Sequence, residues 1–163
     1  MRDYIKIAIE TINDETRGGP KFAFWENVRN QAQRNALLYT SANRLADEDA
    51  VALSDFTVMK TGEDGCVISV DGMYFNRIRD RIQLKKLKEA SADKKNIIFT
   101  MDDGEKITVK VGKATEYIAA VANEIVRLRD GGEPRQNKKE EVKSSSDVVI
   151  VQKSKNNPFS FKL

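Results

Sequence analysis

The sequence predicts an α+β fold in which an antiparallel sheet of about five short strands is closed by a C-terminal helix. Three observations predict it. Apolar residues recur with a helical period as far as residue 45, and with a period of two from about residue 56 to residue 111. One amphipathic stretch follows over residues 114–129. We divide the chain into an N-terminal helical segment (1–48), a β-rich domain with its closing helix (50–130) and a flexible C-terminal tail (131–163).

The N-terminal part predicts two helices separated by a loop. Residues 4–12 place Ile9 and Ile12 on one face of a short amphipathic helix. Residues 13–20 form a loop, because they are rich in residues that interrupt regular structure. A second helix is expected over about 22–45, ending or interrupted near residues 40–46, since apolar residues recur at helical spacing within it. Those residues are Trp25, Val28, Ala32, Ala36 and Tyr39.

The middle of the chain predicts strands joined by tight turns. Residues 56–60 are a strand candidate, and the turn that follows contains Gly62 and Gly65. The next two strands, 66–70 and 73–78, are joined by Asp71-Gly72, which is a strong hairpin signal. Residues 81–88 are expected to form a strand that leads into a short helical turn.

The last strands lead into the closing helix. Residues 96–101 and 106–111 predict a hairpin, and the second strand alternates polar and apolar residues, so one of its faces should be buried. Gly112 ends that strand, and Thr115 is expected to cap the helix. The helix should end near residues 130–134, where glycines and a proline follow. Its apolar stripe comprises Tyr117, Ile118, Val121, Ala122, Ile125 and Leu128.

The order of these elements resembles the bacterial pleckstrin-homology-like domain family over about residues 50–130. The stretch from Gly62 to Phe75 is similar to the family's hairpin, with spaced glycines, an apolar strand, a turn glycine and an aromatic strand. The resemblance implies a small antiparallel β-barrel closed by the C-terminal helix, and binding of phosphoinositides, proteins or peptides. The loop 61–65 carries two acidic residues and no basic one, which argues against lipid phosphate recognition there.

The residue types present argue against an enzyme. The chain of 163 residues has no histidine and one cysteine, which excludes Ser-His and Cys-His dyads, an internal disulfide and the usual zinc sites. Cys66 lies in an apolar run and is interpreted as a buried thiol. We predict no catalytic residue, metal or cofactor. No apolar run is long enough to span a membrane and the N-terminus is no signal peptide, so we expect a cytoplasmic protein.

The basic residues form one dense segment in the folded part. Residues 77–95 contain eight basic and three acidic residues, although residues 1–130 as a whole are neutral. The candidate basic patch is Arg77, Arg79, Arg81, Lys85, Lys86 and Lys88. Such a patch could bind nucleic acid or an anionic membrane. We favour a solvated strand and turn, because no aromatic residue lies between Phe75 and Phe99 to stack on bases.

The tail carries two segments suited to docking. Four successive β-branched residues at 148–151 have a high strand propensity and suit addition to a sheet edge of a partner, of a second copy or of the same domain. Asn157-Pro158-Phe159 resembles a short docking motif. The candidate partner-binding residues are Val148, Val149, Ile150, Val151, Pro158, Phe159 and Phe161. The alternative is an inert, solubilising tail.

Together these features predict a non-enzymatic protein-interaction module or adaptor, or an inhibitor. It would bind a protein partner, or associate with itself, through the domain surface and the tail. The alternative is binding of nucleic acid through residues 77–95, with an anionic membrane surface less favoured. A hydrolase or nuclease that acts through acidic residues has the least support.

Overall fold

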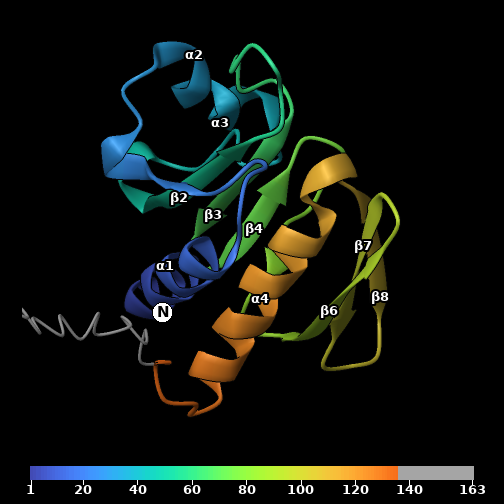
Figure 1. Ribbon diagram of the computed structural model, residues 1–163. Coiled ribbons are helices and arrows are strands. Elements are labelled where there is room, and N and C mark those ends of the chain that lie inside the picture. Colours follow the sequence, from blue (N-terminus) through green and yellow to red (C-terminus); the bar gives the residue numbers. More distant parts are fainter. Residues whose placement is uncertain (136–163) are drawn as a thin grey trace, which may run out of the picture.

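The computed structural model describes residues 1–135, apart from the side chain of Leu38, and contains helices packed against two sheets (Figure 1). The helices are α1 (Arg2–Glu15), α2 (Gln31–Arg34), α3 (Ala36–Tyr39) and α4 (Thr115–Arg129), with 3-10 turns η1 (Trp25–Asn27), η2 (Asp47–Asp49) and η3 (Gly112–Ala114). The strands are β1 (Ala23–Phe24), β2 (Ala50–Asp55), β3 (Gly65–Ser69), β4 (Gly72–Phe75), β5 (Ile82–Gln83), β6 (Leu87–Asp93), β7 (Asn96–Met101) and β8 (Lys106–Lys110).

Two antiparallel sheets and a C-terminal helix confirm the predicted α+β class. One sheet has the order β1-β2-β3-β4-β5 and the other the order β6-β7-β8. The chain turns at residues 84–86 between β5 and β6, and these two strands do not pair. Since neither sheet closes on itself, the closed barrel implied by the family resemblance is not confirmed.

Helices α1 and α4 lie side by side, and their apolar faces pack against the sheets (Figure 1). Ile5, Ile9 and Ile12 of α1 are buried at the spacing that places them on one helical face. The stripe predicted for α4 is buried throughout. Each buried isoleucine contributes about 1.5–3 kcal/mol to stability, so this shared core dominates the packing.

The five-stranded sheet is buried on both faces because its residues alternate between two cores. In β3, Cys66 and Ile68 join the main core with α1 and α4, whereas Val67 faces a second core around Trp25. Residues 25–45 therefore cover the outer face of this sheet. Cys66 is fully buried, and that burial raises the pKa of its thiol well above the usual range.

The helix predicted over 22–45 does not form as one element. Phe22 belongs to the main core and Trp25 to the second core, so the backbone between them is extended and pairs with β2 as β1. The Oδ1 of Asn30 then accepts a hydrogen bond from Ala32 N (2.8 Å) and starts the short helix α2. Helical spacing was the wrong period here because the segment crosses a sheet edge.

The strand predicted over 56–60 is also wrong. Strand β2 ends earlier, at Asp55, whose carboxylate accepts hydrogen bonds from Thr57 N (2.9 Å) and Gly62 N (3.1 Å). These bonds offer the backbone an alternative to a sheet ladder, and residues 56–62 form a loop.

Two further elements differ from the prediction. Strand β6 extends to Asp93, where no strand was predicted, because only Leu87 and Ala90 of its residues face the core. Thr115 does not cap α4: it is the first helical residue, and its Oγ1 donates a hydrogen bond to the carbonyl of Gly112 (2.7 Å).

Candidate functional site

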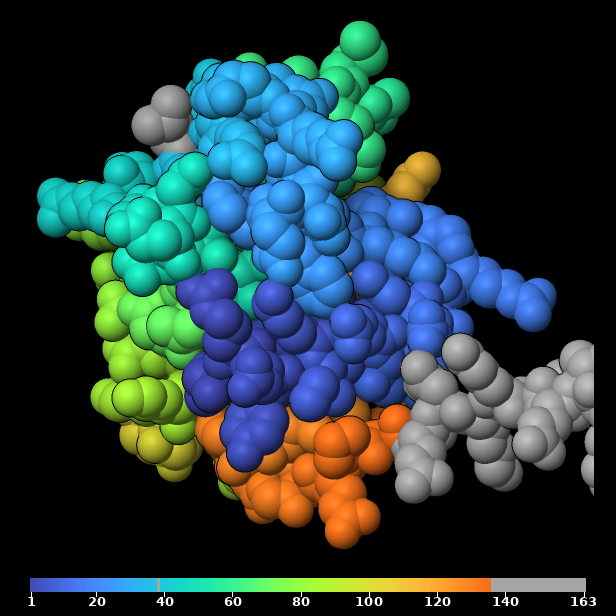
Figure 2. Space-filling model, turned by 90° about the vertical axis from the view of Figure 1, so that its left-hand side faces the viewer, coloured from blue at the N-terminus to red at the C-terminus, as the bar shows by residue number. Residues whose placement is uncertain are grey.

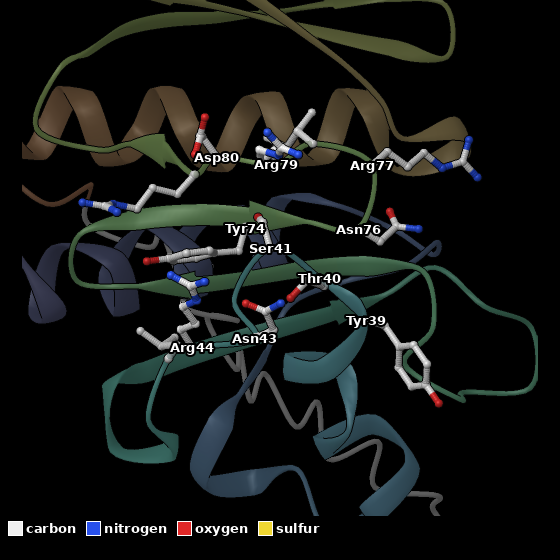
Figure 3. A pocket seen from close by; sticks show the side chains of 13 residues that line it. Tyr39, Thr40, Ser41, Asn43, Arg44, Tyr74, Asn76, Arg77, Arg79 and Asp80 are labelled. Carbon is white, nitrogen blue, oxygen red and sulfur yellow. The ribbon is translucent and has the colours of Figure 1, made fainter.

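A groove of about 980 Å³ lies between the segment after α3 and the connection from β4 to β5. Figure 3 shows Asn43 and Arg44 on one side, Arg77, Arg79 and Asp80 on the other, and Ser41 and Tyr74 between them. Its lining residues are Tyr39, Thr40, Ser41, Asn43, Arg44, Leu45, Tyr74, Asn76, Arg77, Ile78, Arg79, Asp80 and Arg81. Two chain segments that are distant in sequence therefore form one site.

Backbone hydrogen bonds hold the two sides together. Ser41 N donates to the carbonyl of Phe75 (3.0 Å), which places the segment after α3 against the end of β4. The hydroxyl of Thr40 accepts from Ala42 N (3.2 Å) and turns the chain there. The Oγ of Ser41, a residue of the groove lining, is buried and has no hydrogen-bond partner within residues 1–135.

Two of the four arginines in the groove are paired and two are not. Arg77 forms an ion pair with Asp64 (3.3 Å), and Arg81 forms one with Asp71 (3.0 Å). Arg44 and Arg79 form no ion pair with any other residue in the described range 1–135. Their guanidinium groups are thus free to donate hydrogen bonds to an anionic ligand.

Asp71, which contacts the lining residues Tyr74 and Arg81, is already engaged. It accepts hydrogen bonds from the Ser69 hydroxyl and from the hydroxyl of Tyr74 (3.0 Å), besides its ion pair with Arg81. Burial raises the pKa of Tyr74, and the hydrogen bond to Asp71 raises it further, so Tyr74 remains a neutral donor. Asp80 is the single carboxylate in the lining, and donors dominate the groove.

The structure divides the predicted basic patch. Arg77, Arg79 and Arg81 line the groove, whereas Lys85 and Lys86 occupy the turn between β5 and β6, and Lys88 lies on β6 outside the lining. All six are exposed. Their apolar neighbours Ile82, Leu84 and Leu87 are buried, as the solvated-strand interpretation requires.

Arg44 and Tyr39 were missed as site residues. They belong to the segment that was predicted to be the end of a long helix, where an arginine and a tyrosine carry no particular signal. Tyr39 ends α3 and Arg44 lies in the turn that follows, and the contact of this segment with the end of β4 brings both residues to the groove. No local pattern in the sequence could have paired this segment with residues 76–81.

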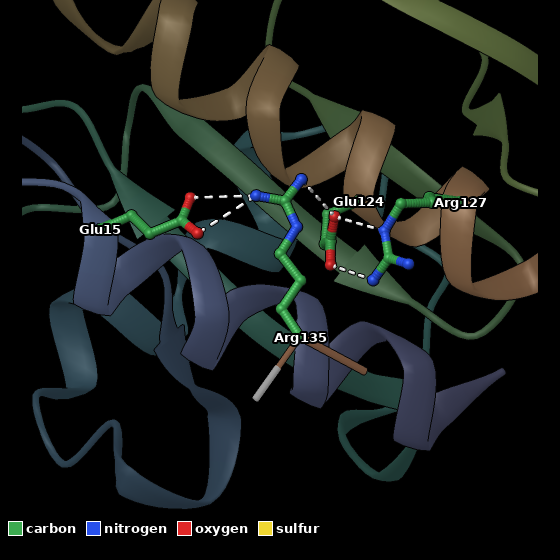
Figure 4. A network of polar contacts seen from close by, with 4 residues as sticks. All are labelled: Glu15, Glu124, Arg127 and Arg135. Carbon is green, nitrogen blue, oxygen red and sulfur yellow. Dashed lines mark hydrogen bonds and ion pairs between the residues drawn. The ribbon is translucent and has the colours of Figure 1, made fainter. Parts of the chain in front are cut away.

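The described chain ends in a network of charged groups (Figure 4). Arg135 contacts Glu15 (3.1 Å) at the end of α1 and Glu124 (3.1 Å) on α4. Glu124 also accepts two hydrogen bonds from Arg127 (2.9 and 2.6 Å), and its side chain is only 1% exposed. These contacts, led by the hydrogen bonds from Arg127, lower the pKa of Glu124. The network fixes the chain after α4 against α1.

The candidate residues of the tail lie outside the described residues. These are Val148, Val149, Ile150, Val151, Pro158, Phe159 and Phe161. Their assignment to partner binding stays a prediction.

Comparison with family models, with curated proteins and with solved structures finds no match to this chain. The resemblance to pleckstrin-homology-like domains therefore stays a prediction. No helix within residues 1–135 is long and apolar enough to cross a membrane. In the same range, no three acidic or cysteine side chains gather closely enough to hold a metal ion.

Proposed function

We propose that this protein is a non-enzymatic interaction module that binds an acidic segment of a partner protein in the arginine groove. The observation that carries the proposal is the pair of guanidinium groups, Arg44 and Arg79, that face the groove without a carboxylate partner in the described range. Arginine binds carboxylates with paired, charge-assisted hydrogen bonds, which favours Asp- and Glu-rich ligands.

The other groups in the groove support the recognition of a peptide. Asn43 offers an amide group that can donate to, and accept from, a peptide backbone, whereas the Nδ2 of Asn76 already donates to the carbonyl of Glu63 (3.4 Å) and its amide oxygen can accept. The groove is open, as an extended segment requires, and its lining holds only one carboxylate that would repel acidic residues.

The tail is the second contact of the proposed adaptor. The β-branched run at 148–151 and the aromatic residues Phe159 and Phe161 are suited to a sheet edge and to an apolar pocket of the partner. Replacing both phenylalanines by serine in the full chain should reduce recovery of the native partner. Unchanged recovery would leave the groove as the sole contact.

Single-stranded nucleic acid is the second candidate ligand, because of one specific observation. Tyr39 lines the groove with its side chain 48% exposed, so an aromatic ring is present beside the arginines. Base stacking on such a ring contributes about 1–3 kcal/mol per base. The basic patch predicted from the sequence lies within residues 77–95 and therefore did not include this ring.

The test measures fluorescence anisotropy of two labelled probes, a short Asp- and Glu-rich peptide and a single-stranded oligonucleotide of similar charge. Arg44→Gln and Arg79→Gln should each weaken peptide binding about tenfold, since each removes hydrogen bonds from a charged group. The matched control is Lys88→Gln, which removes the same charge outside the groove and should change affinity by about twofold or less.

The probes separate the two ligand classes. Peptide binding that Tyr39→Leu leaves unchanged supports the protein ligand. Oligonucleotide binding that Tyr39→Leu weakens, and that loses affinity steeply between about 50 and 200 mM salt, would show that the ligand is nucleic acid and not a protein segment. If neither probe binds, or if Lys88→Gln weakens binding as much as Arg44→Gln, the groove is not the binding site.

A further inference from the structure

The loop 56–62 is held in one conformation by a buried carboxylate. Asp55 is 4% exposed, and it accepts hydrogen bonds from the backbone amides of Thr57 and Gly62 and from the hydroxyl of Thr57 (2.6 Å). Lys60 adopts a positive φ of 55° and its Nζ donates to the carbonyl of Asp55 (3.2 Å). These hydrogen bonds preorganise the loop, and its tip stands out from the surface beside α2 and α3 (Figure 2).

The tip of this loop exposes two large apolar side chains. Val58 is 95% exposed and Met59 is 80% exposed. The other large apolar side chains that are exposed in residues 1–135 are Tyr4 and Tyr39, both below 50% and both with a polar hydroxyl. Adjacent apolar side chains in a preorganised loop are typical of an interface, because exposing apolar surface to water is unfavourable.

A pocket of about 320 Å³ lies directly beside the tip, and Val58 is part of its wall. Its lining also includes the apolar residues Pro20, Phe56, Val111 and Ala114 and the charged residues Asp64, Arg77, Lys110 and Lys113. Met59 follows Val58 in the chain but is not part of the lining. The chain therefore carries an apolar side chain and an apolar pocket next to each other.

The charges around the tip and the pocket are complementary. Lys110 and Lys113 line the pocket, are exposed, and form no ion pair with another residue of the described range. Glu63, beside the loop, is exposed and its carboxylate is likewise unpaired within that range. A positive pocket rim beside a negative loop base is a surface that can pair with itself.

We infer that a second copy of this chain binds here, so that the Met59 side chain of each copy enters the pocket of the other. A two-fold axis that passes between the two loop tips brings each tip to the other copy's pocket, since tip and pocket adjoin. The same rotation places Glu63 of one copy opposite Lys113 of the other. The interface is isologous, small and dependent on concentration.

An anionic membrane is the less favoured occupant. Glu63 lies at the base of the loop and repels anionic lipid, and Lys60 is turned back to the carbonyl of Asp55. Two apolar side chains also bury little surface in a bilayer.

The experiment is sedimentation equilibrium of the full chain over a wide range of protein concentration. The wild type should show a reversible monomer–dimer equilibrium. Met59→Ser should weaken it about tenfold or more, because both copies lose a buried side chain. Tyr4→Ser is the matched control, since it also removes an exposed apolar group, and it should leave the dimer unchanged.

A charge exchange tests the geometry. Lys113→Glu and Glu63→Lys should each weaken the dimer, and the double variant should restore it. A monomer at every concentration overturns the inference, as does a dimer that Met59→Ser does not affect. Binding of monomeric chain to phosphatidylserine vesicles, lost in Met59→Ser, would overturn it in favour of a membrane. None of these three residues lines the arginine groove, so the two proposals fail separately.

Discussion

The buried carboxylate of Glu124 provides the sharpest test of the packing between α1, α4 and the chain that follows. Glu124→Gln keeps the shape of the side chain but removes its charge. Arg127 then loses the anion that accepts its two hydrogen bonds, and Arg135 loses one of its two carboxylate partners. The substitution therefore weakens three charge-assisted contacts at once (Figure 4).

The expected loss in the free energy of unfolding is about 2 kcal/mol. Hydrogen bonds to charged groups contribute about 1.5–3 kcal/mol each when both partners are buried. Here the two arginine side chains are 34% and 50% exposed, so water replaces part of what they lose. In a chain of this size, that loss lowers the melting temperature by about 6 °C.

The assay is urea unfolding followed by the fluorescence of Trp25, the single tryptophan, which is 5% exposed in the folded state. Glu15→Gln is the matched control, because the Glu15 carboxylate pairs with Arg135 alone among residues 1–135 and is 50% exposed. It should cost about 0.5 kcal/mol or less. If Glu124→Gln costs no more than Glu15→Gln, the buried network does not stabilise the fold.

The same pair of proteins gives a prediction for acid pH. The pKa of Glu124 is lowered in the folded state, so its contribution is complete above the unfolded value of 4.5 and is lost as the pH falls through the folded pKa. The difference in unfolding free energy between wild type and Glu124→Gln should therefore shrink from neutral pH to about pH 3. A difference that stays constant over this range would refute an ionised Glu124.

Three further substitutions test contacts between distant parts of the chain. Gly62→Ala should lower the free energy of unfolding by about 2 kcal/mol or more, because φ is +77° and the new Cβ would lie 2.8 Å from a backbone oxygen of α2. Its control is Gly18→Ala, where φ is +73° but no atom lies within 4 Å of the new Cβ, and the loss should be about 1 kcal/mol. Tyr117→Phe should cost about 1–3 kcal/mol by leaving Phe22 N without its acceptor (2.8 Å). Burial raises the pKa of Tyr117 to about 12, so this cost should fall as the pH rises from 10 through 12. Asn123→Ala, which removes two hydrogen bonds to the open edge of β6, should speed amide exchange there while the other strands stay protected. Thermal melts and hydrogen exchange check all three.

The elements that the sequence predicted well are those whose pattern has one cause. In α4, apolar residues recur every third or fourth position because this stripe packs on the main core, although Ala119, Glu124 and Val126 are buried beside it. In the hairpin of β3 and β4, the two apolar strands form as predicted, but the turn lies at Val70-Asp71, one residue earlier than expected, because Gly72 is already the first residue of β4. Local patterns suffice where a segment meets a single environment.

The errors occur where one segment meets two environments. Residues 22–45 cross from the main core, at Phe22, to the second core, at Trp25, so their spacing imitates a helix. Asp55 ends β2 because its carboxylate can satisfy backbone amides up to Gly62, a contact that depends on how the chain returns. These outcomes depend on tertiary partners that spacing along the chain does not reveal.

The sequence by itself determined the α+β class, the neutral folded part and its surplus of arginine and lysine in residues 77–95. Only the tertiary structure decided that Arg44 and Arg79 share one groove and that Val58 and Met59 remain in water beside an apolar pocket. The physical reason is that composition and period follow from burial along a single segment. A binding surface, in contrast, forms between segments, and its charges and cavities exist only once the chain has folded.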